Sequence, residues 1–162
     1  MGAGVMLLCG SKTLIMKRAH YKHDKWSGYW NFPGGQGEPN ETTYQTALRE
    51  TEEETGITSD QYQVVDHVGS KIYTMYIGVC KTEIEPTLDH EHTDWEWVFI
   101  SSIPSLKDEM HPKDWRSFKN YYKISGKGFV VILIFFNFLF FFITIEVFFL
   151  IILTPIVFKT FI

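Results

Sequence analysis

Two short apolar runs open the chain, at residues 5–9 and 13–17. The tripeptide Gly10-Ser11-Lys12 between them is typical of a hairpin turn, so both runs are predicted strands. Residues 18–29 mix cations with aromatic side chains and predict a loop, and the glycines from Gly34 onward interrupt any regular element. Later apolar runs predict three more strands, at residues 64–68, 71–80 and 95–100.

Two helices are predicted as well. Residues 41–55 contain neither Gly nor Pro, and Gly56 stands where a helix commonly ends with one left-handed residue. The stripe of this helix that we expect to face the core carries Tyr44, Ala47, Leu48 and Thr51. A second helix is predicted over residues 112–124. Strands, a helix, more strands and a closing helix favour an α/β fold built in layers.

Composition divides the chain into two parts. Residues 129–162 hold 11 of the 14 phenylalanines and only two charges, Glu146 and Lys159, whereas the preceding residues have the composition of a small soluble domain. We therefore predict an α/β domain at residues 1–125 and an apolar tail at residues 126–162.

The tail is long enough to cross a membrane, because a spanning helix needs about 20 mainly apolar residues and residues 129–158 exceed that length. Several cations precede this stretch and only Lys159 follows it, so the positive-inside rule leaves the domain in the cytosol. A second interpretation is equally open. The Phe/Ile monotony is also typical of translated AT-rich noncoding DNA, which would make the tail an artefact of the gene model.

Charge and cysteine content narrow the classes of function. The 15 Lys and Arg residues against 19 Asp and Glu residues give a net charge of −4, which argues against a broad basic surface for nucleic acid. Two cysteines, Cys9 and Cys80, cannot form a disulfide framework, and the N-terminus does not resemble a signal peptide. A reducing, cytoplasmic setting is therefore expected.

The most informative pattern is a group of glutamates at the end of the first predicted helix. Glu50, Glu53 and Glu54 have the i, i+3, i+4 spacing of one helix face, where each like-charge pair costs roughly 0.2–0.5 kcal/mol. The helix dipole also disfavours anions there. A bound divalent cation would turn this repulsion into coordination, since Mg²⁺ prefers oxygen ligands. The alternative is a solvated acidic helix.

The spacing around these carboxylates resembles the signature of the Nudix hydrolases, G-x5-E-x7-R-E-U-x-E-E-x-G-U. Gly35, Glu41 and the run RETEEETGI at residues 49–57 occupy its fixed positions. The one departure is Thr51, where the family prefers an aliphatic residue; because Thr51 lies on the core-facing stripe, the departure concerns packing. The resemblance covers residues 3–124 and no part of the tail.

The resemblance implies an α/β/α sandwich with a mixed sheet, and hydrolysis of nucleoside diphosphate-linked substrates with Mg²⁺ or Mn²⁺. It implies metal binding by Glu50, Glu53, Glu54 and the carbonyl of Gly35, bracing of the loop by an Arg49–Glu41 pair, and a chain turn at Gly56. No serine, cysteine or P-loop pattern competes, and bound metal can supply both charge neutralisation and water activation.

The catalytic base is expected in the loop before the late tryptophan-containing strand. Glu91 is the first choice, as base or extra ligand, with Glu53 and Glu96 as competitors and a solvated loop carboxylate as the alternative. The imidazole side chains of His90 and His92 are of a kind that suits a zinc site. Two histidines at alternate positions are nevertheless interpreted as surface residues.

Substrate contacts are predicted at two positions. Arg18 is the cation that we expect to contact a phosphate, and Tyr73 lies near where the dinucleoside polyphosphate hydrolases of this family carry a tyrosine. A core role for Tyr73 is the alternative. We predict a metal-dependent pyrophosphohydrolase of (d)NTPs or dinucleoside polyphosphates. A non-catalytic nucleotide-binding module and an RNA-cap pyrophosphohydrolase are the other hypotheses.

Overall fold

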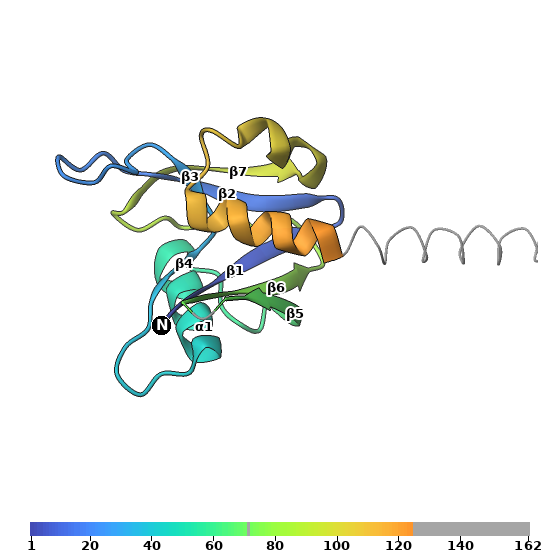
Figure 1. The fold of residues 1–162 in the computed structure, drawn as a ribbon. Helices are drawn as coiled ribbons and strands as arrows, with labels where there is room; N and C mark the ends of the chain where they lie inside the picture. The colour runs from blue at the N-terminus through green and yellow to red at the C-terminus, as the bar shows by residue number, and fades with distance from the viewer. Residues whose placement is uncertain (71, 125–162) are drawn as a thin grey trace, which may run out of the picture. The chain divides into compact units, whose positions relative to one another are not determined.

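A mixed β-sheet organises the computed structural model, which describes residues 1–70 and 72–124 (Figure 1). Its strands are β1 (Gly2–Cys9), β2 (Lys12–Arg18), β3 (Trp30–Asn31), β4 (Gly34–Gln36), β5 (Tyr62–Gly69), β6 (Tyr73–Cys80) and β7 (His92–Phe99). The strand order is β3-β2-β1-β6-β5, with β4 beside β1 and β7 beside β2. The β1–β6 pair is parallel and the other pairs are antiparallel.

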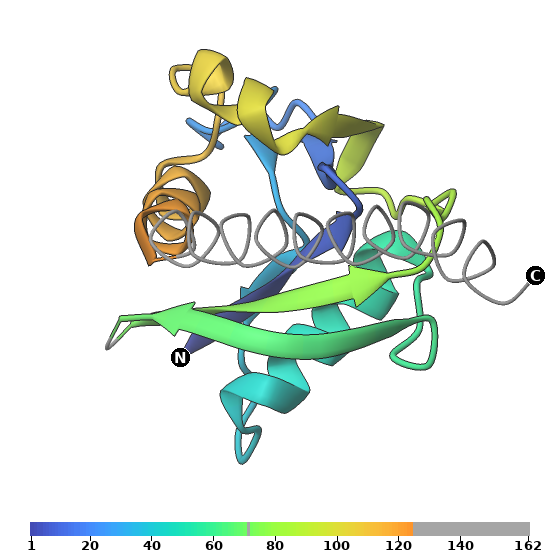
Figure 2. The same ribbon diagram turned by 90° about the vertical axis from the view of Figure 1, so that its right-hand side faces the viewer.

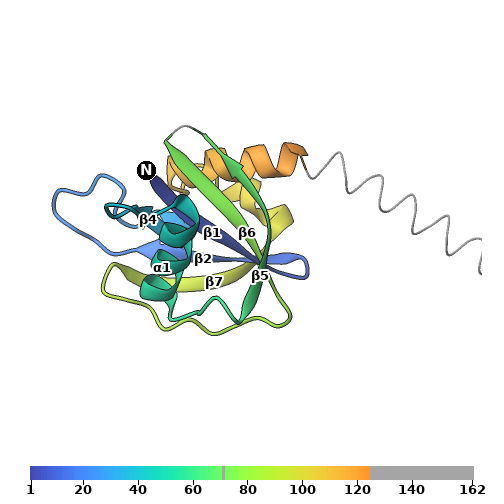
Figure 3. The same ribbon diagram turned by 90° about the horizontal axis from the view of Figure 1, so that it is seen from below.

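Helices cover both faces of the sheet. Helix α1 (Thr43–Thr55) lies on one face, and the helix at residues 112–124 lies on the other (Figures 2 and 3). The 3₁₀ helix η1 (Ile100–Leu106) connects β7 to the second helix. The predicted α/β/α sandwich with a mixed sheet is therefore confirmed.

Strand β1 is the centre of the fold because both of its faces are buried. Side chains alternate along a strand, so Val5 and Leu7 pack in the cluster under α1, while Met6 and Leu8 pack in the cluster under the second helix. Ala47 of α1 completes the first cluster, and Phe118 of the second helix completes the other. The continuous apolar run of β1 is that of a strand covered on both sides.

The ends of α1 follow from its capping residues. The Thr42 side chain accepts a hydrogen bond from the Gln45 amide, and the Gln45 side chain accepts one from the Thr42 amide. This capping box starts the helix at Thr43, two residues later than predicted, and leaves Glu41 in the preceding loop. Gly56 ends the helix with a φ of 67°, as expected from its position.

The structure corrects two details of the predicted stripe and strands. Tyr44 does not face the core, since 44% of it is exposed and its ring meets the edge of Tyr76 instead. Strand β7 begins at His92 rather than at residue 95, because its pairing with β2 extends to Arg18 beyond a bulge. Thr51 is buried as expected, and its hydroxyl donates to the Ala47 carbonyl.

The chain divides into one compact unit at Met1–Tyr121 and a second at Tyr122–Ile162. The site described below lies in the first unit. Within residues 1–70 and 72–124, no helix is both long and apolar enough to span a membrane. The membrane segment predicted at residues 129–158 lies outside the described residues.

Candidate active site

Two carboxylates of α1 meet a pair of glycines in β4. The Gly34 amide donates a hydrogen bond to Glu54 Oε2 at 2.7 Å. The Glu50 carboxylate packs directly on Gly35, where an added Cβ would lie 2.5–2.7 Å from the carboxylate atoms. Any side chain at position 35 would therefore displace Glu50, which explains why a glycine occupies this position.

A glycine is required at position 34 for a different reason. Its φ is 147°, which L side chains rarely adopt, and an added Cβ would lie 2.4 Å from the Gly4 Cα on the neighbouring strand. Strands β4 and β1 pair at this position, Gly4 opposite Gly34. The close backbone approach fixes the glycine pair against the end of α1.

Burial changes the ionisation of both carboxylates. Glu54 is only 6% exposed, and burial raises its pKa to about 8, although the Gly34 amide and the nearby Lys113 cation oppose the rise. Burial also raises the pKa of Glu50, which the Arg49 cation opposes. The site therefore holds carboxyl groups that are costly to ionise unless a further cation arrives.

Arg49 connects the acidic residues around the glycine pair. Its guanidinium lies 2.7 Å from Glu41, 3.0 Å from Glu50 and 2.8 Å from Glu53, and it donates to the Gln36 carbonyl. Hydrogen bonds from Arg49 lower the pKa of Glu41 to about 2 and raise the pKa of the arginine. The structure thus contains the Arg49–Glu41 pair expected from the sequence.

The three predicted metal ligands do not share one exposed face. Glu54 points inward and Glu50 is largely covered, whereas 59% of the Glu53 side chain is exposed and its carboxylate is paired with Arg49. Within the described residues, no three acidic, histidine or cysteine side chains converge closely enough to hold a metal ion. The helical spacing identified neighbouring residues, but packing of α1 against Gly34 and Gly35 covers Glu54 and Glu50 and leaves Glu53 in solvent.

The loop before β7 is attached to the end of α1. The Thr87 amide donates to the Thr55 carbonyl at 2.8 Å, and the Asp89 amide donates to the Glu54 carbonyl at 3.3 Å. The Asp89 carboxylate is close enough to raise the pKa of Glu54 further. Asp89 is therefore a candidate site residue that the sequence analysis missed.

The structure shows that the interpretation of His92 as a surface residue was wrong. His92 is buried, its Nδ1 lies 2.9 Å from Asp89 Oδ1, and its Nε2 lies 3.2 Å from the Asn31 side-chain amide. Burial lowers the pKa of His92, so the ring is neutral and can donate to Asp89 while it accepts from Asn31. His90 is exposed, as expected.

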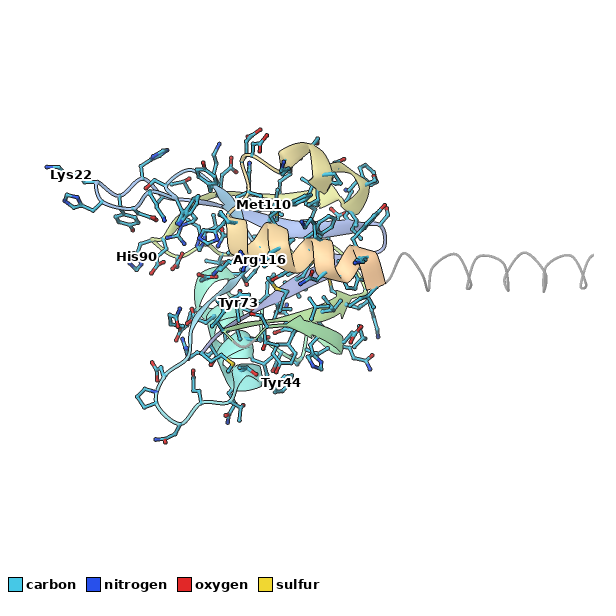
Figure 4. All side chains as sticks on the ribbon, in the orientation of Figure 1. Lys22, Tyr44, Tyr73, His90, Met110 and Arg116 are labelled. Carbon is cyan, nitrogen blue, oxygen red and sulfur yellow. The ribbon has the colours of Figure 1, made fainter. Side chains whose placement is uncertain are left out.

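Glu91 lies in the loop before β7, next to the end of β2 that carries Arg18, since the Ala19 amide donates to the Glu91 carbonyl at 2.7 Å. Figure 4 shows Lys22 and His90 at that end, and the Tyr21 hydroxyl donates to the His90 carbonyl. Glu91 is exposed, and Arg18 is paired with Asp24 at 2.7 Å. Their predicted roles as base and phosphate contact remain predictions.

The Tyr73 hydroxyl lies in the interior. It approaches the backbone of Gly4 and Gly34 and has no hydrogen-bond partner among the described residues. Burial, with the charge of Asp114 nearby, raises the pKa of this tyrosine well above its usual value. This geometry favours the core role over the substrate contact.

The second helix also contributes residues that the sequence analysis missed. Lys113 Nζ donates to the Gly34 carbonyl at 3.1 Å and lies 4.8 Å from the centroid of the Tyr73 ring. Asp114 is completely buried, and neither of its carboxylate oxygens has a hydrogen-bond partner in the described part of the chain. The sequence gives no signal for these contacts, since 79 residues separate Lys113 from Gly34.

The residues present fit a hard divalent cation. Glu50 and Glu54 offer carboxylate oxygens beside the backbone of Gly34 and Gly35, and Mg²⁺ is commonly held by one or two carboxylates together with substrate phosphates. The two buried carboxyl groups also need positive charge when ionised. The fold and this site define a class: layered α/β proteins with an acidic oxygen-donor site at a helix end.

Comparison with known proteins identifies the family within that class. A family model for the NUDIX domain matches residues 1–121, and the chain belongs to the Nudix hydrolase family. An asymmetrical bis(5'-nucleosyl)-tetraphosphatase of Caenorhabditis elegans is 23% identical over 111 residues, which are 62% of this chain and 78% of that protein. An 8-oxo-dGTP diphosphatase of Proteus vulgaris is 41% identical over 66 residues, which are 41% of this chain and 57% of that protein.

Solved structures agree on the fold. A Nudix hydrolase from M. smegmatis, RenU, has a TM-score of 0.68 and 22% identity, covering 78% of this chain and 85% of that one. A C. elegans Ap4A hydrolase binary complex has a TM-score of 0.62 and 19% identity, covering 78% of this chain and 99% of that one.

Proposed function

We propose that this Nudix hydrolase is a divalent-metal-dependent pyrophosphohydrolase, with (d)NTPs or dinucleoside polyphosphates as the favoured substrates. The observation that carries the proposal is the pair of covered carboxylates, Glu50 and Glu54, on the Gly34–Gly35 backbone. A bound Mg²⁺ or Mn²⁺ would neutralise phosphate oxyanions and lower the pKa of an attacking water. The relatives named above act on the same two classes of substrate.

The remaining residues have proposed roles around that pair. Glu53, at the same helix end, is a third candidate ligand or the base, and Glu91 and Asp89 are the candidates for the base from the loop before β7. Arg49 orients Glu50 and Glu53 by holding both carboxylates. Arg18 would contact a phosphate once its carboxylate partner Asp24 is displaced.

Retention of all three glutamates of the Nudix signature, Glu50, Glu53 and Glu54, favours an enzyme over a binding module. RNA-cap hydrolysis has less support, because the net charge of −4 offers no broad basic surface for RNA.

A hydrolysis panel with Mg²⁺ tests the proposal. The panel contains NTPs, dNTPs, dinucleoside polyphosphates, ADP-ribose, NADH and capped RNA, with products separated by chromatography. We expect nucleoside monophosphate from a (d)NTP or a dinucleoside polyphosphate, and loss of product on addition of EDTA. Binding of nucleotides without hydrolysis, with the protein folded and metal present, would favour the binding-module hypothesis.

A further inference from the structure

Both backbone polar groups of Gly34 are held by side chains. Its N–H donates to Glu54 Oε2 at 2.7 Å, and its carbonyl accepts from Lys113 Nζ at 3.1 Å. We propose that Lys113 is a positioning residue: by holding the Gly34 carbonyl, it fixes the glycine pair on which Glu50 and Glu54 rest. The inference rests on the proposed function for its catalytic consequence only.

Lys113 is itself firmly placed. The His111 amide donates to the Trp30 carbonyl at 2.7 Å, which ties the start of the second helix to β3. The Lys113 amide donates to His111 Nδ1, and the ammonium group lies over the Tyr73 ring. Backbone and side chain of Lys113 are thus both anchored, so the ammonium group is a fixed support for Gly34.

A fixed support is needed here because glycine imposes little restraint of its own. Gly34 has no Cβ, so its φ and ψ angles are less restricted by its own side chain than those of other residues, and contacts with neighbouring elements must hold it. The N–H and the C=O of Gly34 belong to adjacent peptide units joined at its Cα, so a change in the Gly34 φ and ψ angles would misdirect the N–H that bonds Glu54 and move Gly35, on which the Glu50 carboxylate packs. The hydrogen bond from the second helix therefore acts together with the pairing of β4 on β1 to place the backbone on which both carboxylates rest.

The test compares Lys113→Met, which keeps most of the length of the side chain but removes the donor and the charge, with Lys113→Arg, which keeps both. The matched control is Lys119→Met, because Lys119 is an exposed cation on the same helix. Hydrogen exchange of the Gly34 amide is measured by mass spectrometry on metal-free, full-length protein. We expect Lys113→Met to accelerate that exchange by about tenfold or more, and the other two variants to stay within about threefold of wild type.

Kinetics supply the second readout. Lys113→Met should lower kcat by about tenfold or more, with KM changed by less than about threefold, and Lys113→Arg should restore kcat. If no variant or wild-type protein hydrolyses nucleotides but the exchange pattern holds, the proposed function fails and the positioning role stands.

Two results would overturn the inference. One is Gly34 exchange in Lys113→Met equal to that in Lys119→Met. The other is an arginine variant that exchanges as fast as the methionine variant, because packing of the side-chain stem would then be responsible. If Lys113→Met does not fold, Lys113→Leu, which also removes the donor and the charge, is interpreted in the same way.

Discussion

Glu52, Glu53 and Glu54 are adjacent residues of one type, yet the structure gives them three environments. Glu52 is exposed, Glu53 is exposed and paired with Arg49, and Glu54 is buried against Gly34. Their intrinsic charge and helix propensity are the same, so differences between substitutions at these positions report the environment alone. Substitutions of the same kind at these three positions therefore form a matched set.

Asp114 gives a prediction for the pH dependence of stability. Burial raises its pKa from 3.8 to about 7, and the neighbouring His111 cannot compensate because burial lowers the pKa of His111 to about 4. Since the folded-state pKa is the higher one, the unfolded chain ionises first as pH rises. Stability is therefore lost between about pH 4 and pH 7, and the penalty is fully present above pH 7.

Asp114→Asn removes this penalty. We expect the variant to be more stable than wild type by about 2–4 kcal/mol near pH 8, and the difference to vanish near pH 4. Urea unfolding at both pH values measures the change, and the titration of Glu54 cancels because it is common to both proteins. An Asp114→Asn protein less stable than wild type at pH 8 would show that the carboxylate is stabilised by a contact not accounted for.

The stability of helix α1 depends on the glycine at its C-terminal end. Gly56 adopts a φ of 67°, its amide donates to the Glu52 carbonyl at 2.8 Å, and an added Cβ would lie 3.3 Å from Thr87. Gly10 has a similar φ of 57° but nothing within 4 Å of an added Cβ. The two glycines therefore separate backbone strain from crowding.

We expect Gly10→Ala to cost about 1 kcal/mol, the penalty of a left-handed non-glycine residue, and Gly56→Ala to cost more. The additional loss comes from contact with Thr87, whose loop carries Asp89 toward the site. Thermal unfolding of both variants measures the difference. Equal losses of stability in the two variants would mean that the loop at Thr87 moves aside at no cost in free energy.

The elements that sequence could predict are those with local signals. The apolar runs predicted the hairpin of β1 and β2, and the absence of Gly and Pro, followed by Gly56, predicted α1 and its end. The start of α1 was missed because Thr42 and Gln45 form a capping box inside the predicted range. Local patterns give the existence of an element more reliably than its first residue.

The site was predicted only in part, for a physical reason. The Nudix signature places Glu50 and Glu54 near Gly35, but packing of α1 on β4 decides that Glu54 is buried and that Glu53 is exposed. Lys113 and Asp89 enter through tertiary contacts with Gly34 and Glu54. No spacing rule along the chain connects residues that meet only after the sheet has formed.

For the whole molecule, ion binding should depend on pH. A metal ion must displace the proton from Glu54, whose pKa is about 8, so affinity should rise between about pH 6 and pH 8.5 and then level off. Calorimetry with Mn²⁺ in buffers of different ionisation enthalpy should find about one proton released per ion near pH 7. Affinity independent of pH would exclude Glu54 from the ligands.

The most direct test of the account is the dependence of hydrolysis on Mg²⁺ for wild type, Glu54→Gln and Glu52→Gln, with the best substrate of the panel. We expect Glu54→Gln to lower kcat by about 10³-fold, because a lost ligand removes stabilisation of transition-state charge, and Glu52→Gln to stay within about threefold. Metal-free Glu54→Gln should unfold at the same temperature as wild type or higher, because it removes a buried carboxyl group whose pKa is raised. Equal losses of kcat at positions 52 and 54 would contradict the account.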